Sequence, residues 1–306
     1  MAAVASVACA LAGGAAVAAS AASQARASAR SPNPGPLTNH LYGVSATSGS
    51  DAWAVGDFQN ASNNYQTLTE HWNGTTWTLK NSPDPSSTSN HLRGVSATSV
   101  SNAWAVGYYD KAAATDTLAE QWNGTTKTWK KFASPDPSST SNSLYGVSAI
   151  SASSAWAVGD YHNNTTGATD TLVLRWNGTT KTWKQMSSPN GSLGAQDPNH
   201  LYGVSATSAA NVWAVGDYVT STNTDRSLIL HWNGAKWTLY SPMPSRLTNE
   251  LYGVSAISAS DALAVGYYSS SNPPPTDTLA LHWNGKTWSR PDTPQVTVCP
   301  SCAPAR

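Results

Sequence analysis

Residues able to do acid–base or nucleophilic chemistry are few in this chain. A glycosidase needs two carboxyl groups at a defined separation in one cleft, but the only glutamates are Glu70, Glu120 and Glu250. Glu70 and Glu120 occupy equivalent positions of a repeat, and most aspartates also recur at repeat positions. No Gly-x-Ser-x-Gly, His-Glu-x-x-His or phosphate-binding glycine loop is present. We therefore expect that the chain is not an enzyme; the catalytic alternative is a glycosidase or lyase acting on polysaccharide.

Metal and cofactor sites are not predicted either. The residue before each Trp-Asn-Gly is always polar, as in His71, Arg175 and His231, but these positions belong to separate repeats. The loop aspartates lack the Asp-x-Asp-x-Asp spacing of a calcium loop. We name no cofactor and no metal ligand.

A second set of polar and aromatic side chains could bind a ligand instead. Each repeat has an asparagine where its first strand begins and a tyrosine or arginine three residues later, and three copies end the second strand with an aspartate. The candidate residues are Asn39, Tyr42, Asp57, Asn90, Arg93, Asn142, Tyr145, Asp160, Asn199, Tyr202, Asp217, Asn249 and Tyr252. They predict either a ring of amides and phenols around a central opening, or asparagines that cap turns and tyrosines that pack between repeats.

The elements that position these residues come from a unit of about fifty residues that occurs five times. Its first half reads Asn-x-Leu-x-Gly-Val-Ser-Ala and then Ala-Trp-Ala-Val-Gly, and its second half ends in Trp-Asn-Gly and another tryptophan. In the first copy these patterns predict strands over 41–47, 52–58, 67–72 and 76–79, and no segment keeps a helical period. The Asn-Gly pair between the last two strands predicts a type I′ hairpin turn.

Four short strands repeating at this period predict an all-β fold, a β-propeller with five blades of four antiparallel strands. The blades are expected over residues 39–82, 90–135, 142–187, 199–241 and 249–290, within a propeller that spans 31–290. Because Ser31-Pro32-Asn33-Pro34 is similar to the linker Ser82-Pro83-Asp84-Pro85, an incomplete ring of six or seven blades is the alternative.

The motif Trp-Ala-Val-Gly followed by Trp-Asn-Gly-x-x-Trp resembles the repeats of kelch and galactose-oxidase-like propellers and of BNR, or Asp-box, propellers. The resemblance covers roughly residues 39–290 and implies the blade fold. It implies no particular activity, because the function of a propeller depends on the site that it carries.

The tryptophans follow the repeat as well. All 14 lie at repeat positions, and Leu263 replaces the fifth tryptophan of the second strand. Large aromatic side chains at such positions are expected in the core. The alternative is that they stack on sugars, as in a multivalent propeller lectin with one site per blade.

Both ends of the chain differ in composition from the repeats. Residues 1–30 are rich in Ala, Val, Ser and Gly and are predicted to be a secretory signal peptide. The protein is therefore expected to be secreted or at the cell surface, with no membrane segment after cleavage. Residues 291–306 are predicted to be a tail in which Cys299 and Cys302 form a disulfide in an oxidising compartment.

Charge and loop lengths narrow the class of partner. Only 11% of residues are charged, Lys+Arg and Asp+Glu number 17 each, and no basic cluster appears, so nucleic acid is not an expected partner. The long, variable loops are all expected on one face of the propeller. We expect a monomeric binding module that uses this loop face to recognise an extracellular glycan or protein. A structural envelope protein without a saturable ligand is the alternative.

Overall fold

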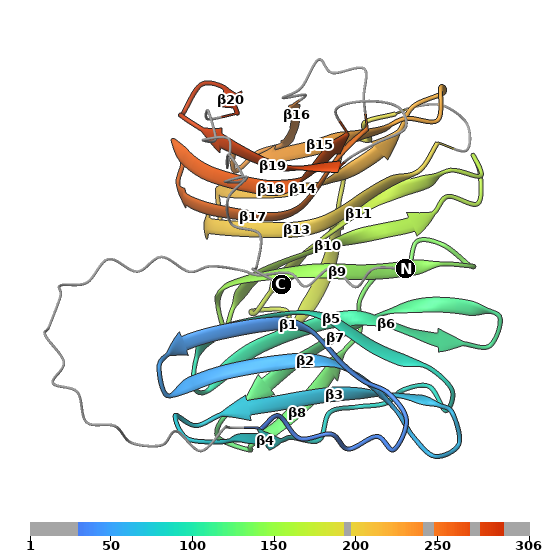
Figure 1. Ribbon diagram of the computed structural model, residues 1–306, viewed down its shortest axis with the longest axis vertical. Coiled ribbons are helices and arrows are strands. Elements are labelled where there is room, and N and C mark those ends of the chain that lie inside the picture. Colours follow the sequence, from blue (N-terminus) through green and yellow to red (C-terminus); the bar gives the residue numbers. More distant parts are fainter. Residues whose placement is uncertain (1–29, 193–196, 241–247, 270–275, 291–306) are drawn as a thin grey trace, which may run out of the picture.

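The computed structural model describes residues 30–192, 197–240, 248–269 and 276–290. These residues form five antiparallel sheets of four strands each (Figure 1). The strands of each sheet are consecutive in the chain, so every sheet is one repeat of the sequence. The predicted all-β propeller of five blades is confirmed. The predicted signal peptide, except for Arg30, and the cysteines Cys299 and Cys302 lie outside the described residues.

Each blade begins with its inner strand and ends with its outer strand. Blade 1 consists of β1 (Asn39–Ser48), β2 (Asp51–Gln59), β3 (Tyr65–Trp72) and β4 (Trp77–Leu79). Blade 2 consists of β5 (Asn90–Ser99), β6 (Asn102–Lys111), β7 (Ala114–Asn123) and β8 (Thr128–Phe132). Blade 3 consists of β9 (Asn142–Ser151), β10 (Ser154–His162), β11 (Thr169–Asn177) and β12 (Thr182–Met186). Blade 4 consists of β13 (Asn199–Ser208), β14 (Asn211–Val219), β15 (Asp225–Trp232) and β16 (Trp237–Tyr240). Blade 5 consists of β17 (Asn249–Ser258), β18 (Asp261–Ser269), β19 (Thr276–Trp283) and β20 (Trp288–Ser289).

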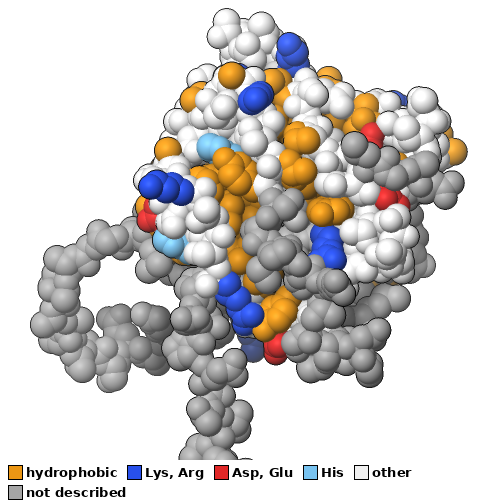
Figure 2. Space-filling view, turned by 90° about the horizontal axis from the view of Figure 1, so that it is seen from above, with side chains coloured by type: hydrophobic (Ala, Val, Ile, Leu, Met, Phe, Trp, Pro, Cys, Tyr) orange, Lys and Arg blue, Asp and Glu red, His pale blue; other side chains and the backbone are white. Residues whose placement is uncertain are grey.

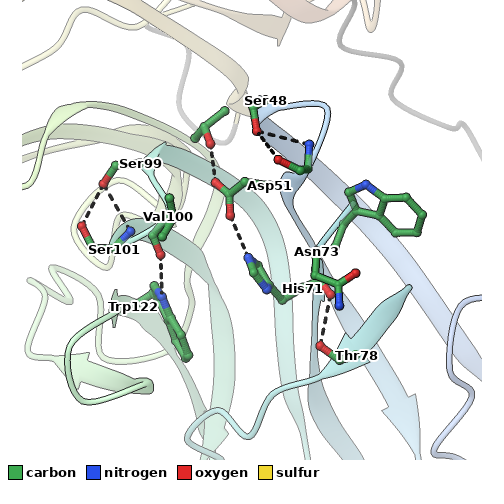
Figure 3. A network of polar contacts seen from close by, with 12 residues as sticks. Ser48, Asp51, His71, Asn73, Thr78, Ser99, Val100, Ser101 and Trp122 are labelled. Carbon is green, nitrogen blue, oxygen red and sulfur yellow. Dashed lines mark hydrogen bonds and ion pairs between the residues drawn. The ribbon is translucent and has the colours of Figure 1, made fainter. Parts of the chain in front are cut away.

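Successive blades are joined by a tryptophan junction. Trp53 of β2 is fully buried against blade 2, where its ring centroid lies 4.6 Å from Trp122 and 4.9 Å from Trp129. Trp129 meets Trp53 edge to face at 81°, a favoured aromatic geometry. Trp122 donates its indole N–H to the carbonyl of Val100 at 3.2 Å (Figure 3). This arrangement buries large aromatic area and explains why strands so rich in Ala and Gly can form a stable stack.

The same junction recurs between all successive blades. The second-strand tryptophans Trp53, Trp104, Trp156 and Trp213 are 0% exposed. Their partners in the next blade are 3–7% exposed: Trp122, Trp129, Trp176, Trp183, Trp232, Trp237, Trp283 and Trp288. The interpretation of the tryptophans as core residues is therefore confirmed for these twelve side chains, and Trp72 and Trp77 of blade 1 are half-buried.

The inner strands extend the packing from blade to blade but not around a full circle. β1 packs on β5, β5 on β9, β9 on β13, and β13 on β17. Among the described residues, no comparable packing joins β17 to β1. Figure 1 shows the blades as stacked layers, with blade 5 at the top and blade 1 near the bottom. Within the described residues, blades 1 and 5 therefore each have one face without a neighbouring blade.

The hairpins between third and fourth strands differ from the predicted turn type. Trp72 pairs with Trp77, so residues 73–76 form the loop. Gly74 has a φ of 92°, but Asn73 does not have a positive φ. Instead, Asn73 Oδ1 accepts hydrogen bonds from the backbone N–H groups of Thr75 and Thr76, each at 2.9 Å. The predicted type I′ turn is wrong, because it requires positive φ at both central residues.

One carboxyl group is buried inside a blade junction. Glu120 of β7 is 0% exposed, and neither of its carboxylate oxygens has a hydrogen-bond partner in the described part of the chain. Burial raises the pKa of Glu120 well above its usual range, and the charge of Asp84 adds to this effect. Glu70, at the same position of blade 1, is instead bound by the Ser31 hydroxyl at 2.8 Å. Blades 3 to 5 have leucine at this position, as in Leu174.

Replacing Glu120 by leucine should stabilise the fold. The folded protein holds a proton on Glu120 that the unfolded chain releases above about pH 4, so the stabilising effect of the proton is complete below that pH. It is lost as the pH rises through the raised pKa. Urea unfolding of Glu120→Leu should therefore give a gain of about 1–3 kcal/mol at pH 7 and a flatter pH dependence. Glu70→Leu, which removes a satisfied carboxylate, should show no gain; equal behaviour of the two variants would contradict this account.

Candidate functional site

A β-bulge in the first strand of every blade creates the site. In blade 1, Leu41 pairs with Gly56 and Gly43 pairs with Val55, so Tyr42 is an extra residue in β1. The other blades have the same irregularity. The extra residues are Tyr42, Arg93, Tyr145, Tyr202 and Tyr252. A bulge re-aims the side chain of its extra residue, and here it does so once per blade at the loop face.

The glycine of the Trp-Ala-Val-Gly motif is what permits the bulge. A Cβ atom on Gly216 would lie 1.9 Å from the carbonyl oxygen of His200, which no side chain can tolerate. The other four blades show the same close approach, at 1.8–1.9 Å. The motif therefore encodes the position of the bulge as well as the strand.

The bulge residues form an aromatic belt across the blades. Tyr145 and Tyr202 lie 5.8 Å apart between ring centroids, and Tyr202 and Tyr252 lie 5.3 Å apart. At the other end, the Arg93 guanidinium lies 4.0 Å from the centroid of the Tyr42 ring, a cation–π contact. We call the five bulge residues the bulge belt. Each of them is partly exposed.

Buried aspartates at the ends of the second strands support the belt. Asp57 accepts from His91 of the next blade at 2.6 Å and lies 3.1 Å from His40 and 3.9 Å from Arg93. Asp160 likewise lies 2.6 Å from His200 of the next blade. These contacts cross the junctions between blades 1 and 2 and between blades 3 and 4. They hold the belt in a fixed arrangement on a rigid scaffold.

Two ionisable side chains beside the belt at blade 4, Asp217 and His200, have shifted pKa values. Burial raises the pKa of Asp217 to about 6, although the His200 charge and a hydrogen bond from Tyr202 oppose the shift. Asp217 Oδ1 has no hydrogen-bond partner among the described residues. Burial alone would lower the pKa of His200, but Asp160, Asp217 and Glu250 outweigh it and raise that pKa. This part of the belt therefore combines a carboxyl group that holds its proton up to about pH 6 with a histidine whose pKa is raised.

Glu250 anchors the far end of the belt. Its Oε2 accepts a hydrogen bond from the Tyr252 hydroxyl at 2.5 Å, and its Oε1 accepts one from the Tyr267 hydroxyl. The two tyrosine rings stack with centroids 6.0 Å apart. Burial, reinforced by the carboxylate, raises the pKa of both phenols. They therefore stay protonated and act as hydrogen-bond donors.

The five asparagines of the candidate set have another role. Asn90 Oδ1 accepts from Ser86 N–H at 2.8 Å, and its amide donates to the carbonyls of Ser86 and of Tyr65 in the preceding blade. Asn142 makes the equivalent bonds. Four asparagines are at most 1% exposed: Asn90, Asn142, Asn199 and Asn249. Half-buried Asn39 caps its own turn through Gly35. The asparagines thus lie at the loop face, but their side-chain amides are hydrogen-bonded within turns and to neighbouring blades.

Several belt partners were not among the residues singled out from the sequence. His40, His91, His200 and Glu250 all follow the strand-initiating asparagine, at the position written as variable in the repeat. The sequence Asn-His-Leu occurs at 39–41, 90–92 and 199–201, which could have shown that histidine recurs there. Tyr108, which ends the second strand of blade 2 where Asp57 ends that of blade 1, also joins the belt, because its hydroxyl accepts from Arg93 at 2.7 Å.

The polar position before each Trp-Asn-Gly lies at the opposite face. His71 Nε2 lies 2.7 Å from Asp51 at the start of β2 (Figure 3). Gln121 and His231 make the same kind of contact with Asn102 and Asn211. These residues tie third strands to second strands. In the described residues, no group of three or more His, Cys, Asp or Glu side chains is arranged to hold a metal ion.

Two further surface features lie away from the belt. Shallow cavities of about 310 and 420 Å³ lie beside blades 3 and 4, lined by residues such as Asn190 and Lys236. Neither contains a bulge residue, and both are open to solvent, so we do not treat them as the site. The described part of the chain has no helix with the length and apolar character needed to span a membrane.

Comparison with known proteins supports the fold class. No family model and no curated protein sequence matches the chain. The solved structure of YjhT is 10% identical over 84% of this chain and 86% of that one, with a TM-score of 0.50. A thermostable family-43 glycoside hydrolase is 10% identical over 86% and 96% (TM-score 0.47). A polysaccharide lyase of the ulvan lyase family is 11% identical over 79% and 67% (TM-score 0.48). At this identity the likeness shows a β-propeller fold; the narrower kelch or BNR resemblance stays a prediction.

These neighbours correct one expectation from the sequence. We expected that the chain is not an enzyme, but the solved structures that it resembles include glycoside hydrolases and polysaccharide lyases. A missing catalytic motif does not exclude catalysis in such a fold, because carboxyl groups from different blades can meet at one end of the propeller. The likeness assigns no activity to this chain.

The pKa of Asp217 makes a prediction for stability. Folded Asp217 keeps a proton up to about pH 6 that unfolded aspartate releases near pH 4, so its stabilising effect is lost as pH rises between those values. In unfolding experiments from pH 4 to 8, the free energy of unfolding of the wild type should fall with pH by on the order of 3 kcal/mol through this group, and Asp217→Asn should not show that fall. Asp57→Asn leaves one acceptor oxygen where His40 and His91 now have two, removes the carboxylate charge, and should be destabilising throughout. A wild-type pH slope in Asp217→Asn would contradict the assignment.

Proposed function

We propose that this protein is an extracellular β-propeller that binds a glycan at the bulge belt. The observation that carries the proposal is the belt itself: five partly exposed side chains, four of them tyrosines, placed at one end of the inner strands by a bulge repeated in every blade. Export is part of the proposal and is supported by the composition of residues 1–30.

The chemistry of the belt suits a sugar. Tyrosine offers an apolar ring to the C–H faces of a pyranose and a hydroxyl to its polar edge. Glu250, Asp217 and His200 add acceptors and donors beside those rings. Ligand sites commonly combine aromatic walls with a few fixed polar groups in this way. The equal numbers of acidic and basic residues favour a ligand recognised by hydrogen bonds over a strongly charged one.

A single site per chain fits the belt better than one site per blade. Arg93 replaces tyrosine only in blade 2, and Glu250 replaces histidine or serine only in blade 5. The two ends of the belt therefore differ chemically. The tryptophans of the Trp-Asn-Gly segments in blades 2 to 5 are buried in junctions and cannot stack on sugars there. We therefore propose one glycan per propeller, lying across several blades.

A second candidate function is cleavage of that glycan. It is favoured by Asp217, a carboxyl group with its pKa raised to about 6 by burial and with Oδ1 lacking a partner among the described residues. A carboxyl group whose pKa is raised toward the working pH can act as a general acid that protonates a glycosidic oxygen, and Asp217 would do so up to about pH 6. Glu250 supplies a second carboxyl group in the same part of the belt, since its charge acts on Asp217.

Binding of the full chain to an array of cell-wall and extracellular polysaccharides tests the proposal. A hit titrated by calorimetry should give a stoichiometry near one, and Tyr252→Phe, which removes the hydroxyl bound to Glu250, should weaken binding about tenfold. Tyr218→Phe, one position beyond Asp217 and outside the belt, is the matched control and should bind like the wild type. Stoichiometry near five, or equal binding by all variants, would contradict the belt as the site.

The same samples test the second candidate. If bound chains are shortened, Asp217→Asn should abolish shortening and retain binding, whereas shortening by Asp217→Asn would exclude this aspartate as the proton donor.

A further inference from the structure

Four equivalent junctions join the five blades, and each has two complementary halves. The leading half is the second-strand tryptophan and the valine two residues later, such as Trp104 and Val106. The receiving half is the first-strand leucine and valine of the next blade, such as Leu144 and Val147. Each junction also has the same hydrogen bond. In it, a first-strand serine hydroxyl accepts from the backbone N–H of an alanine in the next blade at 3.0 Å. The four pairs are Ser45–Ala97, Ser96–Ala149, Ser148–Ala206 and Ser205–Ala256.

Among the described residues, no blade packs on the leading half of blade 5. Leu263 and Val265 are 38% and 48% exposed, whereas the corresponding tryptophans and valines of blades 1 to 4 are 0% exposed. Ser255, the acceptor of the next junction, is exposed. Gly203 has the backbone of the next blade 2.8 Å from the position of a Cβ atom, but Gly253 has only the side chain of Val265 nearby. Figure 2, which looks down on the end where blade 5 lies, shows hydrophobic side chains running across this surface.

Blade 1 has the matching receiving half, and no blade in the described part of the chain packs on its inner part. Leu41 and Val44 are 44% and 48% exposed. The equivalent leucines Leu92, Leu144, Leu201 and Leu251 are all 0% exposed. Ala46, whose N–H would be the donor to a preceding serine, is exposed as well. Each end of the stack therefore presents one half of the interface that the chain uses four times internally.

Within the described residues, no other blade completes the interface, because β17 does not pack against β1. An occupant of these two faces would need a full leading half for blade 1 or a full receiving half for blade 5.

We propose that blade 5 of one copy packs against blade 1 of a second copy, continuing the inter-blade interface head to tail. A second copy is the occupant that brings both complementary halves. Leu263 would face Trp72 and Trp77 as Trp104 faces Trp176 and Trp183, and Val265 would lie on Leu41 and Val44. Ser255 would accept from the N–H of Ala46. Such a heterologous contact joins unlike surfaces, as the internal junctions do. This proposal differs from the monomer expected from the sequence.

The leucine at position 263 sets the strength of this contact. Every internal junction has tryptophan there, and the smaller leucine buries less apolar area. The junction between copies is therefore weaker than those within a copy and depends on concentration. Leu263→Trp restores the internal pattern and should lower the concentration needed for association by about tenfold or more.

Sedimentation equilibrium of the full chain tests the proposal with a complementary pair of variants. Wild type should show a mass that rises with concentration above that of one chain. Leu263→Asp disables the blade 5 face and Val44→Asp disables the blade 1 face, so each variant alone should associate at least about 100-fold more weakly, since a carboxylate would be buried unpaired. Mixed in equal amounts, they should form a dimer and nothing larger, because only one pair of intact faces remains.

Controls separate this result from unfolding or loss of solubility. Both replaced residues are already exposed, so the variants should keep the wild-type urea midpoint; Val265→Asp and Leu41→Asp form a second pair if either does not. Val100→Asp, at an exposed valine in the β5–β6 turn, should associate like the wild type. A wild type and a Leu263→Trp variant that both stay monomeric, or a mixture that forms no dimer, would overturn the proposal. Glycan binding at the belt is read separately and does not depend on this outcome.

Discussion

The packing of one tryptophan between two tryptophans of the next blade is the contact on which the rest of this structure depends. The strands themselves are rich in alanine, glycine and serine, and offer little apolar area of their own. Trp104, held at 4.7 Å from Trp176 and 4.9 Å from Trp183, supplies that area and fixes the distance between its sheet and the next. Because the four junctions are equivalent, the inner strand of each blade packs on the inner strand of the next in the same way.

This regular packing of the inner strands aligns the five bulge residues. A bulge in one strand re-aims one side chain, but identical bulges in five aligned inner strands bring their side chains together as a belt. The glycine after each Ala-Val pair allows the first strand to approach closely enough, and the histidines His91 and His200 reach back to an aspartate of the preceding blade. Scaffold and site are therefore made by the same repeat, and differences such as Arg93 and Glu250 give the site its chemical character.

The repeat made the blades predictable, because hairpins of four strands follow directly from alternation and turn signals. The belt was only partly predictable: Tyr42 and Asp57 were singled out, but the bulge at Leu41-Tyr42-Gly43 was not, because the small residues that follow it show no contrast between faces. The burial of Asn90 and the contact between His91 and Asp57 depend on a neighbouring blade, which no local pattern describes. Leu263 was visible as a departure from the repeat, but its exposure required the arrangement of the blades.

The central claim is that the tryptophan junction holds the blades together. The most direct test is to place leucine, the residue at position 263 of blade 5, in an internal junction. Trp104→Leu keeps an apolar side chain at the position that Leu263 has in blade 5, and removes the aromatic contacts with Trp176, Trp183 and Phe132. Urea unfolding should show a loss of about 2–4 kcal/mol for Trp104→Leu, and less than about 1 kcal/mol for Leu263→Ala at the exposed position. A Trp104→Leu variant as stable as the wild type would show that the tryptophan junction does not hold the blades together.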